Sequence, residues 1–285
     1  MKRVLTIQDI SCIGKCSTTI ALPIISAMGV ETVILPSAIL SAHTIFEGFT
    51  FKDLTAQFAP ICHHWKQQGI HFDAIYTGYL GTIEQMALVR QIFEDFKDED
   101  TLIFIDPVMA DHGKLYPTFD ESYAAENAKF CGAGDIIVPN ITEACLMTQT
   151  PYQEEVDEAF VRELLQKLMT LGVKTAVLTG IGLEEGKNGI YGYDSARDEY
   201  FSYQNDNVGT SFHGTGDLFA SVSVGGILRG LPYREAFALA ADYTVDTIRA
   251  TMANPERRWY GVDFENTIIK LVNSLDERLK KEGVH

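Results

Sequence analysis

Residues 209–228 read GTSFHGTGDLFASVSVGGIL and combine a glycine-rich turn with the start of an apolar helix. Two glycines flank Thr215, Asp217 follows directly, and small or apolar residues continue to Leu228. Such a turn gathers the unpaired N–H groups and the positive dipole end of the helix at one point. The stretch therefore predicts an anion-binding helix start at residues 214–217.

Asp217 is the chemically informative residue of this turn. A carboxylate beside an anion site can take the proton from a hydroxyl group that attacks a phosphate. The same string also fits a glycine turn in which Asp217 only caps the helix. The turn is no P-loop, because GK[ST] is missing, and it lacks the G-x-G-x-x-G spacing of a dinucleotide fingerprint.

The bulk composition restricts the class of protein. The chain has 285 residues, is 46% hydrophobic and carries a formal net charge of −16, with 39 acidic and 23 basic residues. This acidity argues against nucleic acid or an anionic membrane as a partner. A phosphate can still bind locally, because backbone N–H groups and metal ions do not enter the net charge.

Cysteine usage and the N-terminus predict a cytoplasmic protein. The five cysteines form no CxxC pair, which indicates a reducing compartment. The apolar part of MKRVLTIQDI is too short for a signal peptide and is interrupted by Asp9. No window approaches 18 uninterrupted apolar residues, so no membrane span is expected.

Apolar runs and amphipathic segments alternate along almost the whole chain, which predicts βαβ units around a mainly parallel sheet. The expected strands lie at 3–8, 30–37, 72–80, 101–109, 135–140 and 174–182, with an antiparallel pair at 189–194 and 198–203. The expected helices lie at 18–28, 53–68, 82–96, 141–148, 154–172, from 215 onwards, after Pro232, and at 262–282. We see no linker or repeat and predict one domain, 1–285, with a loop or β-flap at 37–52.

Polar residues or glycines stand where these strands are expected to end. They are Gln8–Asp9, Gly78–Tyr79, Asp106, Asn140 with Glu143, and Thr179–Gly180. Each alone is an ordinary solvated loop start. In a parallel sheet, however, they would converge on one crevice at the carboxyl ends of the strands.

Several of these side chains have two interpretations. Asp106 and Glu143 are candidates for Mg²⁺ binding, directly or through water, or are helix caps and loop hydrogen-bond acceptors. Thr179 offers a hydroxyl and an N–H to a phosphate, or is only a strand end. Tyr79 is a wall for a flat ring or a core residue.

The histidines are similarly open to two interpretations. His43 and Thr44, in the expected flap, suit a polar ring substituent, although a lone loop histidine is more often a surface residue. His213 precedes the anion turn and borders a nucleotide in the functional interpretation, but Asp217 is the better base.

Taken together, these residues resemble the pyridoxal/pyridoxine/pyridoxamine (vitamin B6) kinases of the ribokinase superfamily, over nearly the whole chain. The motifs that carry the resemblance are IQDISCIG (7–14), SAHTIFEGFT (41–50), GYLG (78–81), DPVM (106–109), PNITE (139–143) and GTGD (214–217). GTGD is common to the superfamily, whereas the flap His-Thr with GYLG favours vitamin B6 over sugars. DPVM also occurs in hydroxymethylpyrimidine kinases.

The resemblance implies a fold and a set of roles. The fold is a ribokinase-like three-layer α/β sandwich, with helices on both faces of a mainly parallel sheet and a small β-flap. The implied reaction is ATP-dependent phosphorylation of the 5′-hydroxymethyl group of a B6 vitamer. The implied catalytic residues are Asp217, as the base, with Gly214, Thr215 and Gly216. The implied nucleotide-site residues are Asp106, Asn140, Glu143, Thr179, Thr210, Ser211, Phe212 and His213. The implied substrate-site residues are Asp9, His43, Thr44, Tyr79 and Asp217.

The resemblance also implies Mg²⁺ near Asp106 and Glu143, a monovalent cation such as K⁺, an ATP-covering loop at 110–120 and a homodimer. One departure concerns position 9, where many family members have Ser and this chain has Asp9. That carboxylate leaves the preferred vitamer open. A hydroxymethylpyrimidine or other small-alcohol kinase, and a non-catalytic nucleotide- or vitamin-binding regulator, remain alternatives.

Overall fold

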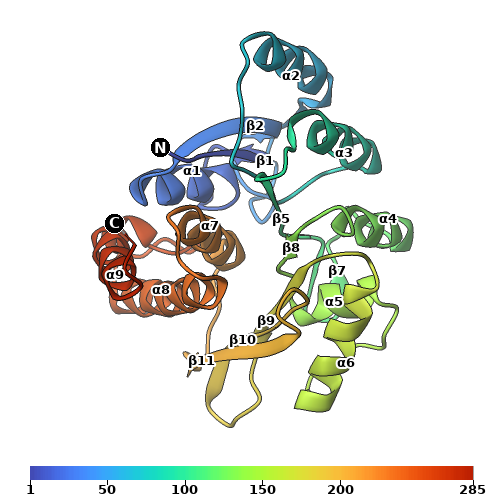
Figure 1. Cartoon of the computed structure of the whole chain (residues 1–285). Coiled ribbons are helices and arrows are strands. Elements are labelled where there is room, and N and C mark those ends of the chain that lie inside the picture. Colours follow the sequence, from blue (N-terminus) through green and yellow to red (C-terminus); the bar gives the residue numbers. More distant parts are fainter. Residues whose placement is uncertain (285) are drawn as a thin grey trace. The chain divides into compact units, whose positions relative to one another are not determined.

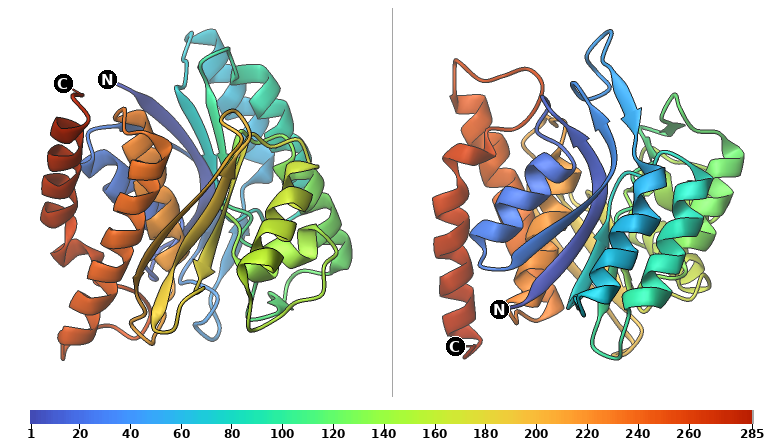
Figure 2. Two further views of the ribbon diagram at one scale, coloured as in Figure 1. Left: turned by 60° about the horizontal axis from the view of Figure 1, so that its bottom comes forward. Right: turned by 90° about the horizontal axis from the view of Figure 1, so that it is seen from above.

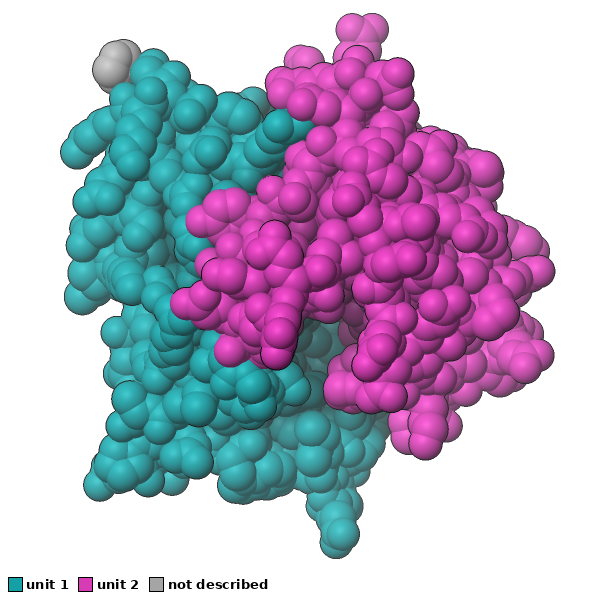
Figure 3. Space-filling model, turned by 90° about the horizontal axis from the view of Figure 1, so that it is seen from below, with its two compact units in different colours: residues 1–74, 208–285 teal, residues 75–207 magenta. Residues whose placement is uncertain are grey.

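The computed structural model describes residues 1–284, which form two compact units (Figure 3). Unit 1 combines Met1–Ala74 with Val208–His285, and unit 2 is Ile75–Asn207. The ends of the chain therefore belong to one unit. This division does not decide the number of domains, so a single domain at 1–285 stays a prediction.

Unit 1 contains three strands of the large sheet and most of the long helices. In chain order its elements are β1 (Arg3–Ser11), α1 (Thr18–Ala27), β2 (Glu31–Leu40), β3 (Phe51–Asp53), the 3₁₀ turn η1 (Thr55–Gln57), α2 (Phe58–Gln67), α7 (Thr215–Leu228), α8 (Tyr233–Ala253), η2 (Phe264–Asn266) and α9 (Ile268–Lys281). β1 pairs with β2 in parallel, and β2 pairs with β3 antiparallel. Figure 1 shows α7, α8 and α9 side by side, and α1 also packs on α7.

The core of unit 1 explains the character of the stretch 209–228. Every residue of α7 from Leu218 to Gly226 is buried, and α7 packs on both α1 and α8. A helix in contact on several sides has no solvent face to leave polar. The apolar, small-residue run is therefore the expected sequence of a fully buried helix.

The predicted end of the first strand at Gln8–Asp9 is wrong. β1 continues to Ser11, and its pairing with β2 shifts register between Gln8 and Ile10. Asp9 lies at this irregularity and is only 5% exposed. A bulge re-aims side chains without ending the strand, which a sequence pattern of period two does not reveal.

The predicted flap at 37–52 is part strand and part loop. Residues 37–40 complete β2, and Phe51–Asp53 form β3 against it, with Leu40 opposite Phe51. The ten residues between them, 41–50, form the connection, which is closed by a hydrogen bond from the Ser41 N–H to the Thr50 carbonyl at 3.0 Å. Ile45 at 57% and Phe51 at 53% exposure leave apolar surface on this hairpin.

Unit 2 contains the remaining strands. Its elements are β4 (Ala74–Thr77, whose first residue belongs to unit 1), α3 (Ile83–Phe96), β5 (Leu102–Ile105), β6 (Ala110–Asp111), β7 (Lys114–Leu115), α4 (Glu121–Cys131), β8 (Ile136–Ile137), α5 (Ile141–Met147), α6 (Glu158–Met169), β9 (Thr175–Ile181), β10 (Lys187–Asp194) and β11 (Glu199–Asp206). β5, β8 and β9 run parallel, as predicted, and β9, β10 and β11 are antiparallel. α3, α4, α5 and α6 follow one another in contact (Figure 2).

Two local features of unit 2 lie outside the predicted elements. The 110–120 loop begins with the β6–β7 hairpin, and α4 follows without having been predicted. α4 begins at the Asp120 cap, whose side chain accepts the Tyr123 N–H. Its residues Glu121–Cys131 are mostly small, polar or charged, so they give a weak 3.6-residue pattern.

Among residues 1–284, no helix combines the length and the apolar character that a membrane span requires.

Candidate active site

Gly214 fixes the geometry of the α7 start. It is the N-cap residue, with a left-handed φ of 85°. A Cβ at this position would lie 2.1 Å from the Lys15 carbonyl oxygen. Only glycine fits both the conformation and the close approach, so the first glycine of the GTGD motif has a structural cause.

Gly216, unlike Gly214, has no close neighbours on the side where a Cβ would point. A Cβ built there would meet no heavy atom within 4 Å, so open space lies over the first turn of α7. The first N–H groups of a helix have no intrahelical partners. The predicted anion site thus has room for a phosphate-sized group beside a helix N-terminus.

Asp217 does not cap α7. The cap position is held by Gly214, and α7 has no side-chain cap hydrogen bond. The Asp217 carboxylate instead accepts a backbone hydrogen bond from Ser17, in the loop after β1. Desolvation raises the pKa of Asp217 to about 7, with a smaller contribution from the Asp9 charge, against the lowering effect of Ser17. A carboxyl that is half-ionised near neutral pH suits a general base.

Asp9 lies near Asp217 and is more deeply buried. Burial raises the pKa of Asp9, while hydrogen bonds from the Ser17 and Ser11 side chains lower it. The Ser11 hydroxyl donates to Asp9 Oδ2 at 2.8 Å. His43 is close enough for its charge to act on Asp9. The structure therefore brings two predicted substrate-site residues, Asp9 and His43, into one polar cluster with Asp217.

His43 is held in a defined orientation. The Ile45 N–H donates to its Nδ1 at 3.2 Å, so Nε2 carries the proton and donates to the Tyr260 carbonyl oxygen at 3.0 Å. Its ring centroid lies 4.3 Å from that of His213. Desolvation by the surrounding protein, with a smaller contribution from His43, lowers the pKa of His213 to about 4, although that residue keeps exposed surface.

The other predicted residues of unit 1 are more accessible. Thr44, Thr210 and Ser211 are exposed, and Phe212 is partly exposed. Phe212 also supports the turn, because its carbonyl accepts from the Thr215 hydroxyl at 3.0 Å. Thr210, Ser211 and Phe212 directly precede the α7 start in sequence, and their exposed surface leaves room for ligand contact.

In unit 2, Glu143 is the centre of a buried network. Asn140 and Glu143 form a capping box at the start of α5: the Glu143 N–H donates to Asn140 Oδ1 at 3.0 Å, and the Asn140 N–H donates to Glu143 Oε2 at 2.9 Å. The Met109 N–H donates to Glu143 Oε1 at 2.9 Å. Burial raises the pKa of Glu143 to about 7, against these backbone hydrogen bonds.

The remaining predicted residues of unit 2 lie around this network. Asp106 directly follows β5 and is 8% exposed. Asn140 forms an isolated parallel bridge with Thr179, whose N–H donates to the Pro139 carbonyl at 3.0 Å. The structure therefore brings Asn140, Glu143 and Thr179 together, with Asp106 three residues before the Met109 donor.

The carboxylates fit a loosely held magnesium ion better than a resident metal centre. Within residues 1–284, no group of three or more His, Cys, Asp or Glu side chains could hold a metal. Mg²⁺ is commonly held by one or two carboxylates together with water and substrate phosphates. Asp106 and Glu143 both belong to that class of donor. Because both Glu143 oxygens already accept backbone N–H groups, Glu143 suits an interaction through water.

Tyr79 is partly exposed and belongs to an aromatic row. Its ring centroid lies 5.6 Å from that of Phe119, which stacks on Tyr123 at 3.7 Å. The Tyr123 hydroxyl donates to the Leu80 carbonyl at 2.5 Å. Tyr79 is thus supported on one side and retains accessible surface.

Sequence reasoning missed the loop 14–17, although it supplies a hydrogen bond to Asp217. The contact uses the Ser17 backbone, which leaves no signature in residue type. It also missed Asn127 of α4, whose side-chain N–H donates to the Pro107 carbonyl at 2.9 Å in the turn after Asp106. No motif marked α4, so no pattern pointed to this contact.

The chain is similar in sequence and in fold to known proteins. A family model described as phosphomethylpyrimidine kinase matches residues 24–259. A crystal structure of a candidate phosphomethylpyrimidine kinase from Bacteroides thetaiotaomicron, in a form with pyridoxal, is 33% identical, has a TM-score of 0.90 and covers 95% of each chain. Pyridoxal kinase from Lactobacillus plantarum is 28% identical, with a TM-score of 0.88 over 100% of both chains. These similarities confirm the predicted ribokinase-like α/β class.

A curated relative from Schizosaccharomyces pombe, described as a candidate pyridoxal kinase, is 27% identical over 164 residues. The match covers 55% of this chain and 47% of the relative. A match to a candidate pyridoxal kinase from Caenorhabditis elegans covers 48% of that protein. The matched part of the chain thus spans about half the length of these two curated relatives.

Proposed function

Because the chain belongs to the phosphomethylpyrimidine kinase family, we propose that it transfers the γ-phosphoryl group of ATP to the 5′-hydroxymethyl group of pyridoxal, pyridoxine or pyridoxamine. The reaction would serve the salvage of vitamin B6. Two similarities support this choice of substrate: the pyridoxal-containing crystal of the 33% identical protein and the 28% identical pyridoxal kinase.

The observation that carries the proposal is the state of Asp217. A carboxyl with a pKa of about 7 stands at the N-terminus of a buried helix, and open space lies over the neighbouring Gly216. A base and an anion-binding helix start side by side are the parts that transfer of a phosphoryl group to an alcohol needs.

In the proposed mechanism Asp217 takes the proton of the 5′-hydroxyl as that oxygen attacks phosphorus. The backbone N–H groups of Gly214, Thr215, Gly216 and Asp217 stabilise the charge on the transferring phosphoryl group. Asp9, His43 and Thr44 bind the substrate ring. The segment Thr210–His213 borders the nucleotide.

In unit 2, Asp106, Asn140, Glu143 and Thr179 would serve the nucleotide, and Tyr79 the substrate ring. Asp106 would hold Mg²⁺, with Glu143 acting through water. Bound with ATP, Mg²⁺ would neutralise charge on the phosphate oxygens. A monovalent cation such as K⁺ completes the proposed cofactors, and no residue is assigned to it.

An ADP-release assay with pyridoxal, pyridoxine, pyridoxamine and hydroxymethylpyrimidine tests the function. We expect turnover with at least one B6 vitamer. Turnover with hydroxymethylpyrimidine alone would favour the second candidate, a hydroxymethylpyrimidine kinase, which the family model and Asp9 support. Tight ATP binding without turnover on any alcohol would contradict both and indicate a non-catalytic binder.

The proposal extends to the whole molecule. We propose one catalytic domain, with residues 110–120 covering ATP, in a cytoplasmic homodimer. None of the five cysteines forms a disulfide within the described residues, which suits a reducing compartment. Exposed apolar side chains on the β2–β3 hairpin, including Ile39, Ile45 and Phe51, suit contact with a second copy. Sedimentation equilibrium would give twice the monomer mass if the dimer forms.

A further inference from the structure

The loop between β1 and α1 has a backbone conformation that its surroundings must support. Lys15 and Ser17 have positive φ angles of 56° and 48°, which residues other than glycine rarely adopt. Such conformations persist where neighbouring structure over-determines them, and they gather at functional sites.

This loop is also the part of unit 1 that meets the candidate base. The Lys15 carbonyl approaches Gly214 so closely that a Cβ there would be 2.1 Å from the oxygen. Two residues further on, the Ser17 backbone donates a hydrogen bond to the Asp217 carboxylate. A displacement of residues 15–17 would therefore change both the start of α7 and the position of the carboxylate.

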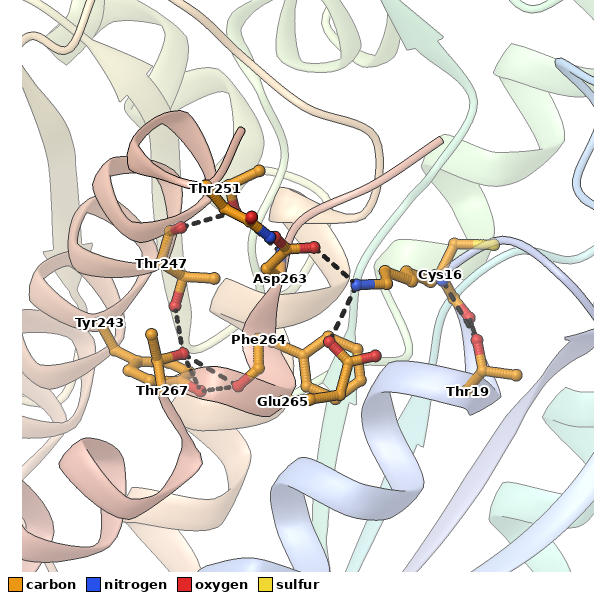
Figure 4. Close-up of polar contacts among 11 residues, drawn as sticks. Cys16, Thr19, Tyr243, Thr247, Thr251, Asp263, Phe264, Glu265 and Thr267 are labelled. Carbon is orange, nitrogen blue, oxygen red and sulfur yellow. Dashed lines mark hydrogen bonds and ion pairs between the residues drawn. The ribbon is translucent and has the colours of Figure 1, made fainter. Parts of the chain in front are cut away.

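The Lys15 side chain is anchored in the C-terminal part of unit 1 by contacts with Asp263 and Glu265, two residues labelled in Figure 4. Its Nζ donates to Asp263 Oδ1 at 3.0 Å and to Glu265 Oε2 at 2.9 Å. The side chains of Lys15 and Asp263 are 15% and 6% exposed, whereas that of Glu265 is 54% exposed. The shielded contact to Asp263 is therefore the stronger constraint, because solvent screens it less.

Asp263 is in turn held by hydrogen bonds to α8 and to Asn254, the residue that follows α8. Its Oδ2 accepts from Asn254 Nδ2 at 2.6 Å, and its N–H donates to Thr251 Oγ1 at 2.8 Å. The Thr251 hydroxyl donates to the Thr247 carbonyl of the same helix at 2.8 Å. Both oxygens of the buried carboxylate are thus engaged, one by Lys15 and one by Asn254.

The segment before Asp263 contacts the same loop independently. A Cβ on Gly261 would lie 2.8 Å from Lys15 Cβ and 3.1 Å from the Gly14 carbonyl oxygen. The neighbouring Tyr260 carbonyl accepts the His43 Nε2–H at 3.0 Å. The C-terminal segment therefore packs on the loop by shape as well as by charge.

We propose that Lys15 and Asp263 are positioning residues, which hold the strained loop 14–17 in place and thereby aim the Asp217 carboxylate. Neither residue is required to touch substrate. The catalytic half of this inference rests on the proposed function, in which Asp217 is the base. The structural half, in which the Lys15–Asp263 pair orders the loop, does not depend on the proposed function.

The test compares two ion pairs of the same unit. Removing one partner alone would leave a shielded charge unpaired, so the variant is the double substitution Lys15→Met/Asp263→Asn, with Lys15→Arg as the conservative variant. The matched control is the double substitution Arg278→Met/Asp242→Asn. Arg278 binds Glu235 at 2.5 Å and Asp242 at 2.6 Å, and its side chain is 18% exposed, but it joins α9 to α8 and not to the loop.

Amide hydrogen exchange of residues 12–19 gives a readout that does not depend on activity. We expect faster exchange in the double variant, and wild-type exchange in Lys15→Arg and in the control. Exchange at the wild-type rate in the double variant would overturn the inference, whatever the enzyme's activity.

Steady-state kinetics test the catalytic half. In the double variant we expect kcat to fall by roughly ten- to a hundredfold, the scale of a misplacement of about 1 Å, with a smaller change in KM. Lys15→Arg should restore most of kcat. The acidic limb of the pH profile should move to higher pH, because a looser Ser17 donor stabilises the Asp217 anion less, beside Asp9 of β1 and Cys16 of the loop.

Wild-type kcat together with faster exchange would overturn the positioning role and leave the base role of Asp217 intact. A loss of kcat equal to that of the Arg278→Met/Asp242→Asn control would overturn it too, since the effect would then be general destabilisation. A wild-type protein that turns over no alcohol would overturn the proposed function and the catalytic half, and the exchange result would still decide the structural half.

Discussion

The carboxyl group of Asp217 is subject to two opposing influences within one unit. Desolvation and the nearby Asp9 charge raise its pKa to about 7, and the hydrogen bond from Ser17 restrains that rise. Asp9 is the more buried of the two residues, and it accepts from the hydroxyls of Ser11 and Ser17. Different surroundings thus separate the two acids into a candidate base and a candidate substrate contact.

Replacing Asp217 tests the base role directly. We expect Asp217→Ala to lower turnover by about 10²–10⁴, the usual contribution of a general base, while the affinity for ATP stays near that of wild type. Single-turnover kinetics and nucleotide titration measure the two quantities. Glu121→Ala, an exposed acid in the first turn of α4, is the matched control, and equal losses in both variants would contradict the role.

The raised pKa predicts the pH dependence of kcat/KM. A base must be ionised to take a proton, so activity should rise with pH and level off above about 7, near the pKa of Asp217. The profile should be measured with two alcohol substrates that ionise at different pH values. An acidic limb that follows the substrate's own pKa would show that Asp217 does not set it.

The sequence revealed some of these residues because their types are unusual in their places. Asp217 stood out as a carboxylate in a glycine turn, and Asp106 and Glu143 followed apolar runs. Ser17 could not be found in this way, because its contribution to Asp217 is a backbone N–H. Lys15 and Asp263 are 248 positions apart, and two ordinary charged residues carry no signal that they pair.

At the scale of elements, the start of α7 explains why its two glycines are not equivalent. Gly214 is needed for a positive φ and for contact with Lys15, whereas Gly216 stands under open space. The first is therefore a requirement of the fold. The second is, in our proposal, a requirement of the phosphoryl group that would occupy the space.

This difference predicts opposite outcomes for two alanine substitutions. Gly216→Ala should keep or raise stability, because alanine is the better helix former by about 1 kcal/mol, yet lower turnover because its methyl group enters the anion site. Gly214→Ala should lower the melting temperature. Thermal unfolding and the ADP-release assay separate the two effects, and wild-type turnover in Gly216→Ala would argue against a phosphoryl group at that point.

Glu143 illustrates an element boundary that is also a candidate site. Its carboxylate accepts from Asn140 at the start of α5 and from Met109 in the turn after Asp106, so one side chain joins two segments. The sequence motif suggested both a cap and a ligand, and the structure confirms the cap.

Removing this carboxylate should destabilise unit 2. Glu143→Ala leaves the Met109 and Asn140 N–H groups without their acceptor, and each unsatisfied buried donor costs about 1–3 kcal/mol, although the Asn140 side chain still accepts the backbone N–H at position 143. Urea unfolding would measure the change. A control is available in Glu158→Ala at the start of α6, an exposed acid, which should cost much less; equal costs would mean that the box contributes little.

At the scale of the whole molecule, alternation along the chain was enough to predict the parallel strands and most helices. It failed where tertiary contacts override the local pattern, as in β1 at Asp9, and where a helix has few apolar residues, as in α4. The division into Met1–Ala74 with Val208–His285 and Ile75–Asn207 could not be predicted, because the first unit is assembled from the two ends of the chain and no linker marks its borders.

Both units contain acids whose pKa is raised, and this predicts how stability depends on pH. Asp217 and Glu143 have pKa values raised to about 7, from ordinary values of 3.8 and 4.5. At pH values between the ordinary and the raised pKa of each acid, the folded state holds protons that the unfolded state has lost. The free energy of unfolding therefore falls as the pH rises through this range. His43 and His213 act oppositely, because their pKa values are lowered from 6.5, and their effect fades above about pH 6.5 as the unfolded chain loses their protons.

Between about pH 6.5 and 8 the unfolded chain still loses the remaining histidine protons, but Asp217 and Glu143, with pKa values of about 7, hold more protons in the folded state than the two histidines hold in the unfolded state, so the acids determine the sign. We therefore expect the urea midpoint to fall across this range, and the net charge of −16 adds repulsion in the same direction. Asp217→Asn, which keeps the shape of the side chain but cannot titrate, should flatten the slope. A midpoint that rises steadily from pH 6.5 to 8, or a slope unchanged in Asp217→Asn, would mean that Asp217 is already ionised at neutral pH, and its assignment as a base poised near pH 7 would then fail.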